Sequence, residues 1–339
     1  MDTLTHALSG ALAARVTAGA PVAGALPLRH RLAAGLLAAA FPDIDFALRL
    51  VDTLTYLNLH RGITHSLVML PLWTLVLAWL LSRCLRGGHA WRAYCGPVAL
   101  GLAAHIAGDL ITAYGTTLFA PLSAQQVEFP LVYVIDPWFS GIVAAGLAGS
   151  LILRRGRAVA AGCLALLAAY VGLLAVMQQR AVDAGRAHAL ARGWPQAAVH
   201  ALPQPFSPFH WKIIVAREGG YEEANVSLWR RAPAEPGRDA GLLRRMDAAY
   251  LPLAAALWQK HWQFGESAAE IELAREAWHS PALAPFRRFA QHPALDGIDL
   301  GPQETCVWFA DLRFALPGVP PSFRYGACRH GAAPWTLRQ

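Results

Sequence analysis

Charged residues are scarce in this chain. Only 15% of its 339 residues are Asp, Glu, Lys or Arg, whereas a soluble globular domain has about 25%. Two stretches, 66–82 and 158–177, contain no charged residue. Apolar runs of about 17–25 residues match the hydrocarbon core of a bilayer. The deficit therefore indicates a membrane protein rather than a soluble one.

The chain also lacks a concentrated block of basic residues. Its net charge is +7, but residues 1–179 hold 11 arginines against seven acidic residues, and residues 180–339 hold 18 basic against 15 acidic. Nucleic-acid-binding proteins gather their positive charge on one surface or segment. We therefore expect no nucleic-acid partner and attribute the arginines to the orientation of a membrane protein.

Familiar signatures of soluble enzymes are missing as well. The sequence contains no nucleophile elbow, P-loop or Rossmann fingerprint. It shows no internal repeat or low-complexity tract. No basic residue precedes the first apolar segment, so we expect no cleavable signal peptide.

The apolar segments and the arginines together predict a topology. We expect about six membrane helices, at about 5–25, 31–42, 66–82, 93–113, 138–153 and 158–177. Three short basic loops connect the first helix to the second, the third to the fourth and the fifth to the sixth. They are Arg29–Arg31, Arg83–Arg92 with Arg86, and Arg154–Arg157. Short cytoplasmic loops are enriched in Lys and Arg, so the amino terminus, the loops 43–65 and 114–137, and the carboxyl-terminal region are predicted to be periplasmic.

The predicted fold is mainly α, with a small extramembrane α+β domain. Residues 1–179 form the helical membrane domain, 180–205 a linker and 206–339 the α+β domain. Glu218-Gly219-Gly220 separates two β-prone runs, which is a hairpin signal. The other elements expected here are helices at Asp239–Lys260 and Ser267–Trp278, and strands at Cys306–Leu316 and Ser322–Arg329 that pair with each other.

The five cysteines divide between the two regions. Cys84, Cys95 and Cys163 lie in or near apolar segments and are interpreted as small buried residues. Cys306 and Cys328 lie in the polar carboxyl-terminal region. A disulfide between them would fit an oxidising periplasm, and two unpaired core thiols are the alternative.

Histidine and aspartate recur together in four short runs of the first third. Residues 1–179 hold only seven acidic residues, and four of them lie in these runs. The runs are Asp2–His6, Phe41–Asp45, His60–Ser66 and His105–Asp109. The predicted topology brings all four to the outer face of the membrane. Imidazole and carboxylate groups that converge in this way are typical of a metal site.

Each run also has an ordinary structural interpretation. His105 and Asp109 are four residues apart and share a helix face, so they could bind one ion or form a hydrogen bond between helices. Asp2 could simply cap the first helix, which would leave His6 one turn further along. Asp136 before Pro137 is also interpreted as a cap.

The two loop runs are open to similar alternatives. Gly62 allows a tight turn that would aim His60 and His65 inward. Arg61 could hold an anionic group or pair with Asp52. Asp43 and Asp45 could be solvated carboxylates that end a helix. As functional residues, Asp43 is the better candidate ligand, and Asp45 points the other way if the turn is extended.

Nitrogen and oxygen ligands without thiolate suit Zn²⁺, with Mn²⁺ and Fe²⁺ as alternatives. A catalytic zinc ion has three protein ligands and a water, so this set could hold one ion or two. The predicted ligands are His6, Asp43, His60, His65, His105 and Asp109. Such an ion lowers the pKa of water toward 7 and polarises a phosphoryl or carbonyl oxygen, which favours hydrolysis.

These residues resemble the YdjM-like family of bacterial inner-membrane, metal-dependent hydrolases. The matching pieces, in order, are Asp2-x-x-Thr5-His6-x-x-x-Gly10, Pro42-Asp43-Ile44-Asp45, His60-Arg61-Gly62-x-Thr64-His65-Ser66 and His105-x-x-x-Asp109-x-x-Thr112-x-x-Gly115. The resemblance implies a multi-pass inner-membrane protein with metal-dependent hydrolase activity. A more distant similarity to all-helical zinc-dependent phospholipase C folds suggests a phosphoester or phospholipid substrate.

The leading hypothesis is therefore a membrane-bound metallohydrolase whose site faces the periplasm. Asp45 would act as general base and Arg61 would hold an anionic group of a lipid-linked or phosphoester substrate. One alternative is a metal-ion transporter, although transport sites lie near the bilayer midplane and these residues gather at one end. The other is a non-catalytic scaffold stabilised by metal.

Overall fold

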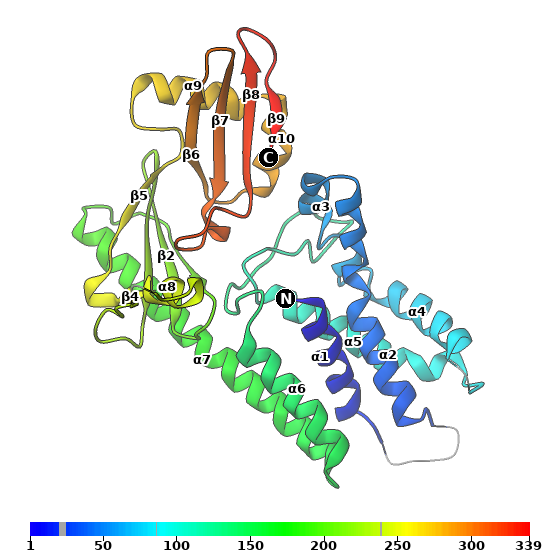
Figure 1. Cartoon of the computed structure of the whole chain (residues 1–339). Coiled ribbons are helices and arrows are strands. Elements are labelled where there is room, and N and C mark those ends of the chain that lie inside the picture. The colour runs from blue at the N-terminus through cyan, green and yellow to red at the C-terminus, as the bar shows by residue number, and fades with distance from the viewer. Residues whose placement is uncertain (20–24, 86, 238) are drawn as a thin grey trace. The chain divides into compact units, whose positions relative to one another are not determined.

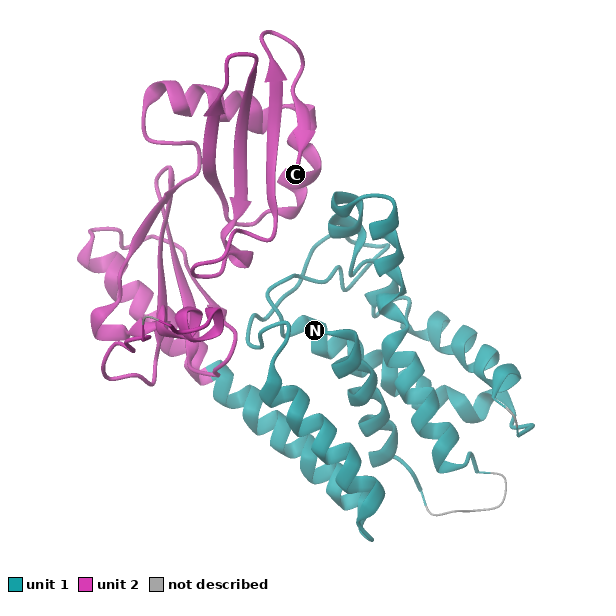
Figure 2. Cartoon of the chain, in the orientation of Figure 1, with its two compact units in different colours: residues 1–175 teal, residues 176–339 magenta. Residues whose placement is uncertain are grey.

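The computed structural model describes residues 1–339 except 20–24, 86 and 238. The end of the first predicted span and Arg86 of the second basic loop therefore lie outside the described residues. The chain divides into two compact units, Met1–Ala175 and Val176–Gln339 (Figure 2). Each unit is described by itself.

Unit 1 is helical, as predicted (Figure 1). Its elements are α1 (Thr3–Val16), α2 (Leu28–Ala40), the 3-10 helix η1 (Pro42–Leu50), α3 (Thr53–Leu59), the 3-10 helix η2 (Ile63–His65), α4 (Leu70–Cys84), α5 (Trp91–Leu110), α6 (Pro137–Ile152) and α7 (Gly156–Ala191), which continues into unit 2. The described part of the unit has seven α-helices rather than the expected six. The additional helix α3, with η1 and η2, occupies a segment that we expected to be a loop.

The described helices differ in their ability to cross a membrane. Helix α7, with 36 residues, is long and apolar enough to span a bilayer. The segment Thr53–His65 and helix α4 pass the same test together but are bent by 81°. By contrast, α1 has 14 residues and is about 21 Å long, shorter than a hydrocarbon core of about 30 Å. Length and composition thus support one or two spans, and the six-span topology stays a prediction.

Three glycines bring helices α1, α2 and α5 into backbone contact. A Cβ atom added at Gly10 would lie 2.3 Å from the carbonyl oxygen of Gly35, and one added at Gly101 would lie 2.4 Å from the same atom. Any larger residue would force the helices apart, so glycine is required by close approach rather than by its φ angle. We call Gly10, Gly35 and Gly101 the glycine contact.

The ends of two helices in unit 1 are fixed by aspartate caps, as expected. The Asp2 carboxylate accepts a hydrogen bond from the amide of Thr5 at 2.9 Å. The Asp136 carboxylate accepts from the amides of Trp138 and Phe139, with Pro137 at the first position of α6. The hydroxyl of Tyr170 donates to the other oxygen of Asp136 at 2.8 Å and so ties α6 to α7. These caps define where α1 and α6 begin.

Unit 2 contains two sheets. The first has the order β1-β2-β3-β4, with β5 also paired to β3, and the second is an antiparallel meander in the order β6-β7-β8-β9. The strands are β1 (Val199–Pro203), β2 (His210–Arg217), β3 (Gly220–Ser227), β4 (Leu251–Pro252), β5 (Gln259–Trp262), β6 (Pro293–Leu300), β7 (Glu304–Asp311), β8 (Arg324–His330) and β9 (Thr336–Arg338). The helices are α8 (Leu242–Ala248), α9 (Ala268–His279) and α10 (Ala284–Phe289), with 3-10 helices η3 (Leu253–Ala255), η4 (Pro281–Leu283) and η5 (Leu312–Phe314).

Most expected elements of the carboxyl-terminal region are present. The hairpin β2–β3 turns at Gly219, whose φ of +75° suits glycine. Helix α9 begins at a capping box formed by Ser267 and Glu270, and β7 pairs with β8. The single helix predicted for 239–260 is wrong. The α-helix α8 ends at Ala248, and the chain then forms β4, the short 3-10 helix η3 and β5, because Leu251 and Pro252 and then Gln259 to Trp262 pair with β3. Residues 180–205, expected to be a linker, form the end of α7 and strand β1.

The cysteines in unit 2 form a disulfide. Cys306 on β7 and Cys328 on β8 are directly opposite in the register and their sulfurs are bonded. Of the two alternatives left open by the sequence, the structure therefore has the disulfide. Among the free cysteines, Cys163 is buried and Cys95 half-buried, but Cys84 is exposed, contrary to expectation.

One buried lysine connects the two sheets of unit 2. The ammonium group of Lys212 on β2 donates to the carbonyl oxygens of Leu312 and Ala315, and it lies 3.3 Å from the Glu223 carboxylate. Burial lowers the pKa of Lys212, and the neighbouring Glu223 opposes that shift. The three acceptors compensate for the loss of water around this charge.

The glycine contact can be tested by substitution. We expect Gly101→Ala to destabilise unit 1 by about 1–3 kcal/mol through overpacking, and to lower its thermal unfolding temperature in detergent. Gly96→Ala on the same helix is the matched control, because its added methyl group meets nothing within 4 Å. That variant should be neutral or slightly stabilising. Equal effects of the two substitutions would show that the helices do not approach as described.

Candidate metal centre

The four His/Asp runs meet in unit 1 at one end of the glycine contact. His6 on α1 precedes Gly10 by four residues, and His105 on α5 follows Gly101 by four. Since one helical turn is about 3.6 residues, the contact holds these two rings close together. Their centroids lie 3.8 Å apart in a stacked arrangement. The convergence that the sequence predicted is thus a consequence of backbone packing one turn away.

Four possible ligand atoms lie close together at the centre of the cluster. The Oδ2 atom of Asp109 lies 3.3 Å from Nε2 of His65 and 3.2 Å from Nε2 of His105. The Oδ1 atom of Asp43 lies 3.7 Å from each of the same two nitrogens. Ligands bound at about 2.0–2.1 Å to a tetrahedral zinc ion lie about 3.3 Å from one another. The spacing therefore fits one ion, and we call these four atoms the donor set.

The tautomer of His105 is fixed by the main chain. Its Nδ1 atom lies 2.6 Å from the carbonyl oxygen of Ala39 on α2. A carbonyl oxygen can only accept, so Nδ1 carries the proton. In the neutral ring, Nε2 then presents a lone pair to the donor set. This is the arrangement that metal-binding histidines adopt.

His65 is oriented in a comparable way. Its Nδ1 atom lies 2.9 Å from the hydroxyl oxygen of Thr64. That hydroxyl donates its own proton to Asp45 at 3.1 Å, so it accepts from the ring. The Nε2 atom of neutral His65 therefore also presents a lone pair to the donor set.

Three atoms of the donor set are buried and lack hydrogen-bond partners among the described residues. They are Nε2 of His65, Nε2 of His105 and Oδ2 of Asp109. Their side chains are at most 1% exposed. Buried polar atoms are almost always paired, and electron-rich atoms that face one another repel. A cation between them removes both problems, so the residues present fit a divalent metal ion.

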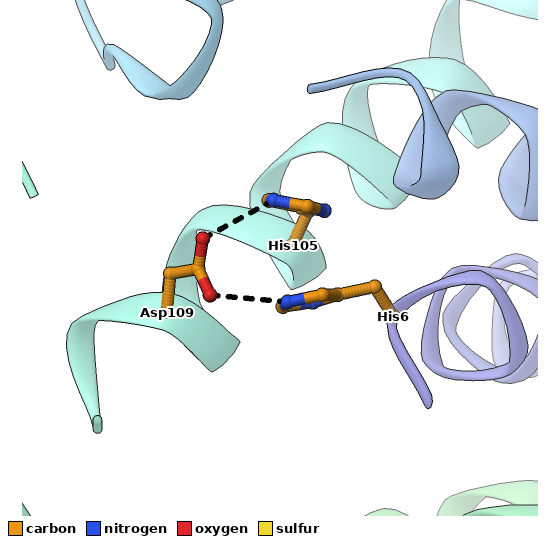
Figure 3. A group of neighbouring side chains, drawn as sticks. All are labelled: His6, His105 and Asp109. Atoms are coloured by element: carbon orange, nitrogen blue, oxygen red, sulfur yellow. Dashed lines mark hydrogen bonds and ion pairs between the residues drawn. The ribbon is translucent and has the colours of Figure 1, made fainter. Parts of the chain in front are cut away.

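The second oxygen of Asp109 is fully engaged elsewhere. Its Oδ1 atom lies 2.7 Å from the amino nitrogen of Met1, 3.1 Å from Nε2 of His6 and 2.9 Å from the guanidinium of Arg61. Figure 3 shows His105 and His6 on opposite oxygens of the carboxylate. Because the oxygen accepts, Nε2 of His6 is the donor in this arrangement.

The guanidinium group of Arg61 is engaged by groups of the protein itself. It is only 3% exposed, and it donates to the carbonyl oxygen of Asp109 and the hydroxyl of Thr112. The expected pairing with Asp52 is wrong, since Asp52 caps α3. Arg61 also has the left-handed φ of +61°, while Gly62 has φ −91°. The left-handed residue is therefore Arg61, one before the position we expected. Glycine is needed at 62 for a different reason, because a Cβ atom there would lie 2.8 Å from the Leu59 carbonyl oxygen.

Asp45 joins His60 to the loop that carries His65. Its Oδ1 atom accepts from Nδ1 of His60 at 2.8 Å. Its Oδ2 atom accepts from the Arg61 amide and the Thr64 hydroxyl. The segment is a 3-10 helix rather than an extended turn. Asp45 therefore lies in the cluster, whereas an extended turn would have pointed it away.

Asp43 is oriented by a threonine. The Thr3 hydroxyl donates to its Oδ2 atom at 2.6 Å, which leaves Oδ1 facing the two histidines. Burial acts to raise the pKa of Asp43, but the neighbouring imidazoles of His65 and His105 and the Thr3 hydroxyl lower it overall. Asp43 is therefore ionised at neutral pH, as a metal ligand must be.

All eight predicted site residues and their neighbours are accounted for by these contacts. Three overlapping groups have ligand atoms close enough to hold an ion: His6 with His105 and Asp109, Asp43 with His65 and His105, and Asp45 with His60 and His65. Sequence reasoning missed two contacts, the amino nitrogen of Met1 and the carbonyl oxygen of Ala39. Neither has a side-chain signature that a motif could reveal.

The fold and this cluster define a class: a helical protein with a long apolar helix and a buried His/Asp site that could bind metal. The chain belongs to the YdjM inner membrane protein family, whose model matches residues 1–181. It is also 30% identical over 143 residues to the uncharacterized protein YfhP of Bacillus subtilis (strain 168). That match covers 41% of this chain and 42% of YfhP. No solved structure gives a significant match.

Metal content is the direct test of the site. We expect purified wild-type protein to retain a divalent ion in elemental analysis, and His105→Gln to lose it because one lone pair of the donor set is removed. His30→Gln is the control, since His30 is a buried histidine that hydrogen-bonds Tyr94 away from the cluster. Asp45→Asn should weaken metal affinity about 10–100-fold, as partners of ligating residues usually do. Retention of metal by His105→Gln, with the fold intact, would contradict the assignment.

Proposed function

We propose that this protein is a membrane-bound, metal-dependent hydrolase whose substrate is a phosphoester or a lipid-linked molecule. One observation carries the proposal: three buried nitrogen and oxygen atoms, on His65, His105 and Asp109, lie within 3.2–3.3 Å of one another through Asp109 and have no hydrogen-bond partner among the described residues.

The proposed site holds one ion rather than two. Its ligands are His65, His105, Asp43 and Asp109, all through the donor set. The other oxygen of Asp109 already has three cationic or N–H neighbours, and Nδ1 of His60 is bound to Asp45. His6 and His60 are thus not ligands in this proposal. They hold Asp109 and Asp45 in place. Zn²⁺ suits nitrogen and carboxylate ligands at these spacings, with Mn²⁺ and Fe²⁺ as alternatives.

A divalent ion here supplies a Lewis acid that polarises a phosphoryl or carbonyl oxygen. The chain's own residues set its surroundings. Ala39 and Thr64 hold the two ligating rings in their metal-binding tautomers. Arg61 holds Asp109 and neutralises its second oxygen. The roles predicted for Asp45 as general base and Arg61 as a substrate clamp stay predictions, and the contacts of both favour positioning.

We further propose that the site faces the periplasm. Two features support this side. The positive-inside rule places the three basic loops in the cytoplasm and the site on the opposite side, and disulfides persist in oxidising compartments such as the periplasm. The Cys306–Cys328 bond lies in unit 2.

The topology prediction is tested with alkaline-phosphatase fusions, because this enzyme is active only after export. A fusion after residue 190 should be active and one at residue 88 inactive. The opposite pair of results would place unit 2 and the site in the cytoplasm.

The activity prediction uses a soluble phosphodiester and a phospholipid in mixed micelles. We expect hydrolysis that a chelator abolishes and Zn²⁺ restores. Asp109→Asn should lower kcat/KM by about 100-fold or more, since a ligand and the partner of Arg61 are both lost. His30→Gln should retain wild-type activity. Bound metal without hydrolysis of either substrate would favour a metal-stabilised scaffold instead.

A further inference from the structure

The segment that carries half of the candidate site is covered outside by apolar side chains. Residues 42–65 contain η1, α3 and η2, and we call them the η1–α3 segment. Asp43, Asp45, His60 and His65 of this segment belong to the cluster, while six large apolar residues are exposed. They are Leu50 (90%), Val51 (74%), Ile44 (62%), Leu59 (56%), Phe46 (53%) and Ile63 (50%).

Such a surface is unusual for a loop in water. Single exposed leucines are common on soluble proteins. Six large apolar residues within one short segment form a patch, and patches of this kind mark contact with a partner or a membrane. The only formal charges outside the cluster in this segment are Arg49 and Asp52. Arg49 lies over the Phe46 ring at 5.5 Å, as a basic residue does when its stem follows an apolar surface.

The patch continues into a helix that already has the composition of a membrane element. The segment Thr53–His65 and helix α4 pass the test for a span together, with an 81° bend between them. This is the geometry of a broken span or a re-entrant loop. The exposed apolar residues continue through Leu67, Val68, Leu72, Leu75, Val76, Trp79 and Leu80. Since the family is one of inner-membrane proteins, the bilayer is the occupant that this continuity supports.

We propose that the η1–α3 segment lies in the membrane interface, with Ile44, Phe46, Leu50 and Val51 in the acyl layer. An amphipathic segment of this kind lies in the interface with its apolar face a few ångströms below the headgroups. The Asp43 side chain in the same segment is only 13% exposed and belongs to the donor set, so insertion of its exposed neighbours places the donor set at headgroup depth. If the protein is the hydrolase proposed above, its substrate is then the phosphoester headgroup of a membrane lipid, which reaches the site laterally from the bilayer.

Depth measurement tests the insertion by itself. A nitroxide spin label is placed at Leu50→Cys or Val51→Cys in the full chain with Cys84, Cys95 and Cys163 replaced by serine and the disulfide kept. The protein is reconstituted into vesicles of phosphatidylethanolamine and phosphatidylglycerol. We expect both labels to be relaxed more by oxygen, which concentrates in lipid, than by a water-soluble nickel chelate.

Leu300→Cys is the matched control, because Leu300 is an exposed leucine (75%) in unit 2. Its label should show the opposite preference. Labels at 50 and 51 that respond as the one at 300 does would overturn the insertion. A label that is relaxed by neither agent would show that protein covers the patch and would overturn it too.

The lipid substrate is tested with Leu50→Asp combined with Val51→Asp. We expect activity on phospholipid in vesicles to fall about tenfold or more, as two apolar anchors are lost, while activity on a soluble phosphodiester is unchanged. Leu300→Asp should change neither. Equal loss on both substrates would overturn the lateral route. Absence of any hydrolysis by the wild type would refute the proposed function. The insertion of the η1–α3 segment would then still be decided by the depth measurement alone.

Discussion

The backbone contact of α1, α2 and α5 at Gly10, Gly35 and Gly101 is the constraint on which the site depends. It brings the backbones of the three helices into direct contact. His6, Ala39 and His105 each lie four residues, or about one turn, from one of these glycines. At any larger separation, the carbonyl of Ala39 would not reach Nδ1 of His105, and the tautomer of that ring would no longer be fixed.

Asp109 divides the cluster into two electrostatic halves. Its Oδ1 atom faces cationic or N–H groups, including the Arg61 guanidinium, and its Oδ2 atom faces lone pairs. A buried carboxylate without compensation is costly. The arginine and the amino nitrogen stabilise it when the site is built, and the donor set remains free for a cation. This division explains why an arginine can lie next to residues that suit a metal ion.

The remainder of unit 1 supplies the other half of this cluster. The elements η1, α3 and η2 contribute Asp43, Asp45, His60 and His65. In the same segment Leu54 and Leu57 are buried, while Ile44, Phe46, Leu50 and Val51 are exposed. One short segment therefore combines buried polar groups of the site with an exposed apolar surface.

Several features were determined by the sequence. The uncharged runs predicted helices, the turn residues predicted the β2–β3 hairpin, and the i, i+4 spacing of His105 and Asp109 predicted a shared helix face. These predictions depend on local periodicity and composition, which act over a few residues. The helix predicted for 239–260 failed for the complementary reason, because pairing with the distant strand β3 outweighed local propensity.

Only the tertiary structure decided which atoms form the donor set. All eight predicted residues lie in or against the cluster, but their sequence does not distinguish a ligand from a neighbour. That distinction comes from a main-chain carbonyl 66 residues from His105, from a left-handed turn at Arg61 rather than Gly62, and from the two faces of one carboxylate. A hydrogen bond to a backbone atom has no residue-specific signature, so the protonated nitrogen of each ring follows from packing and not from the order of amino acids.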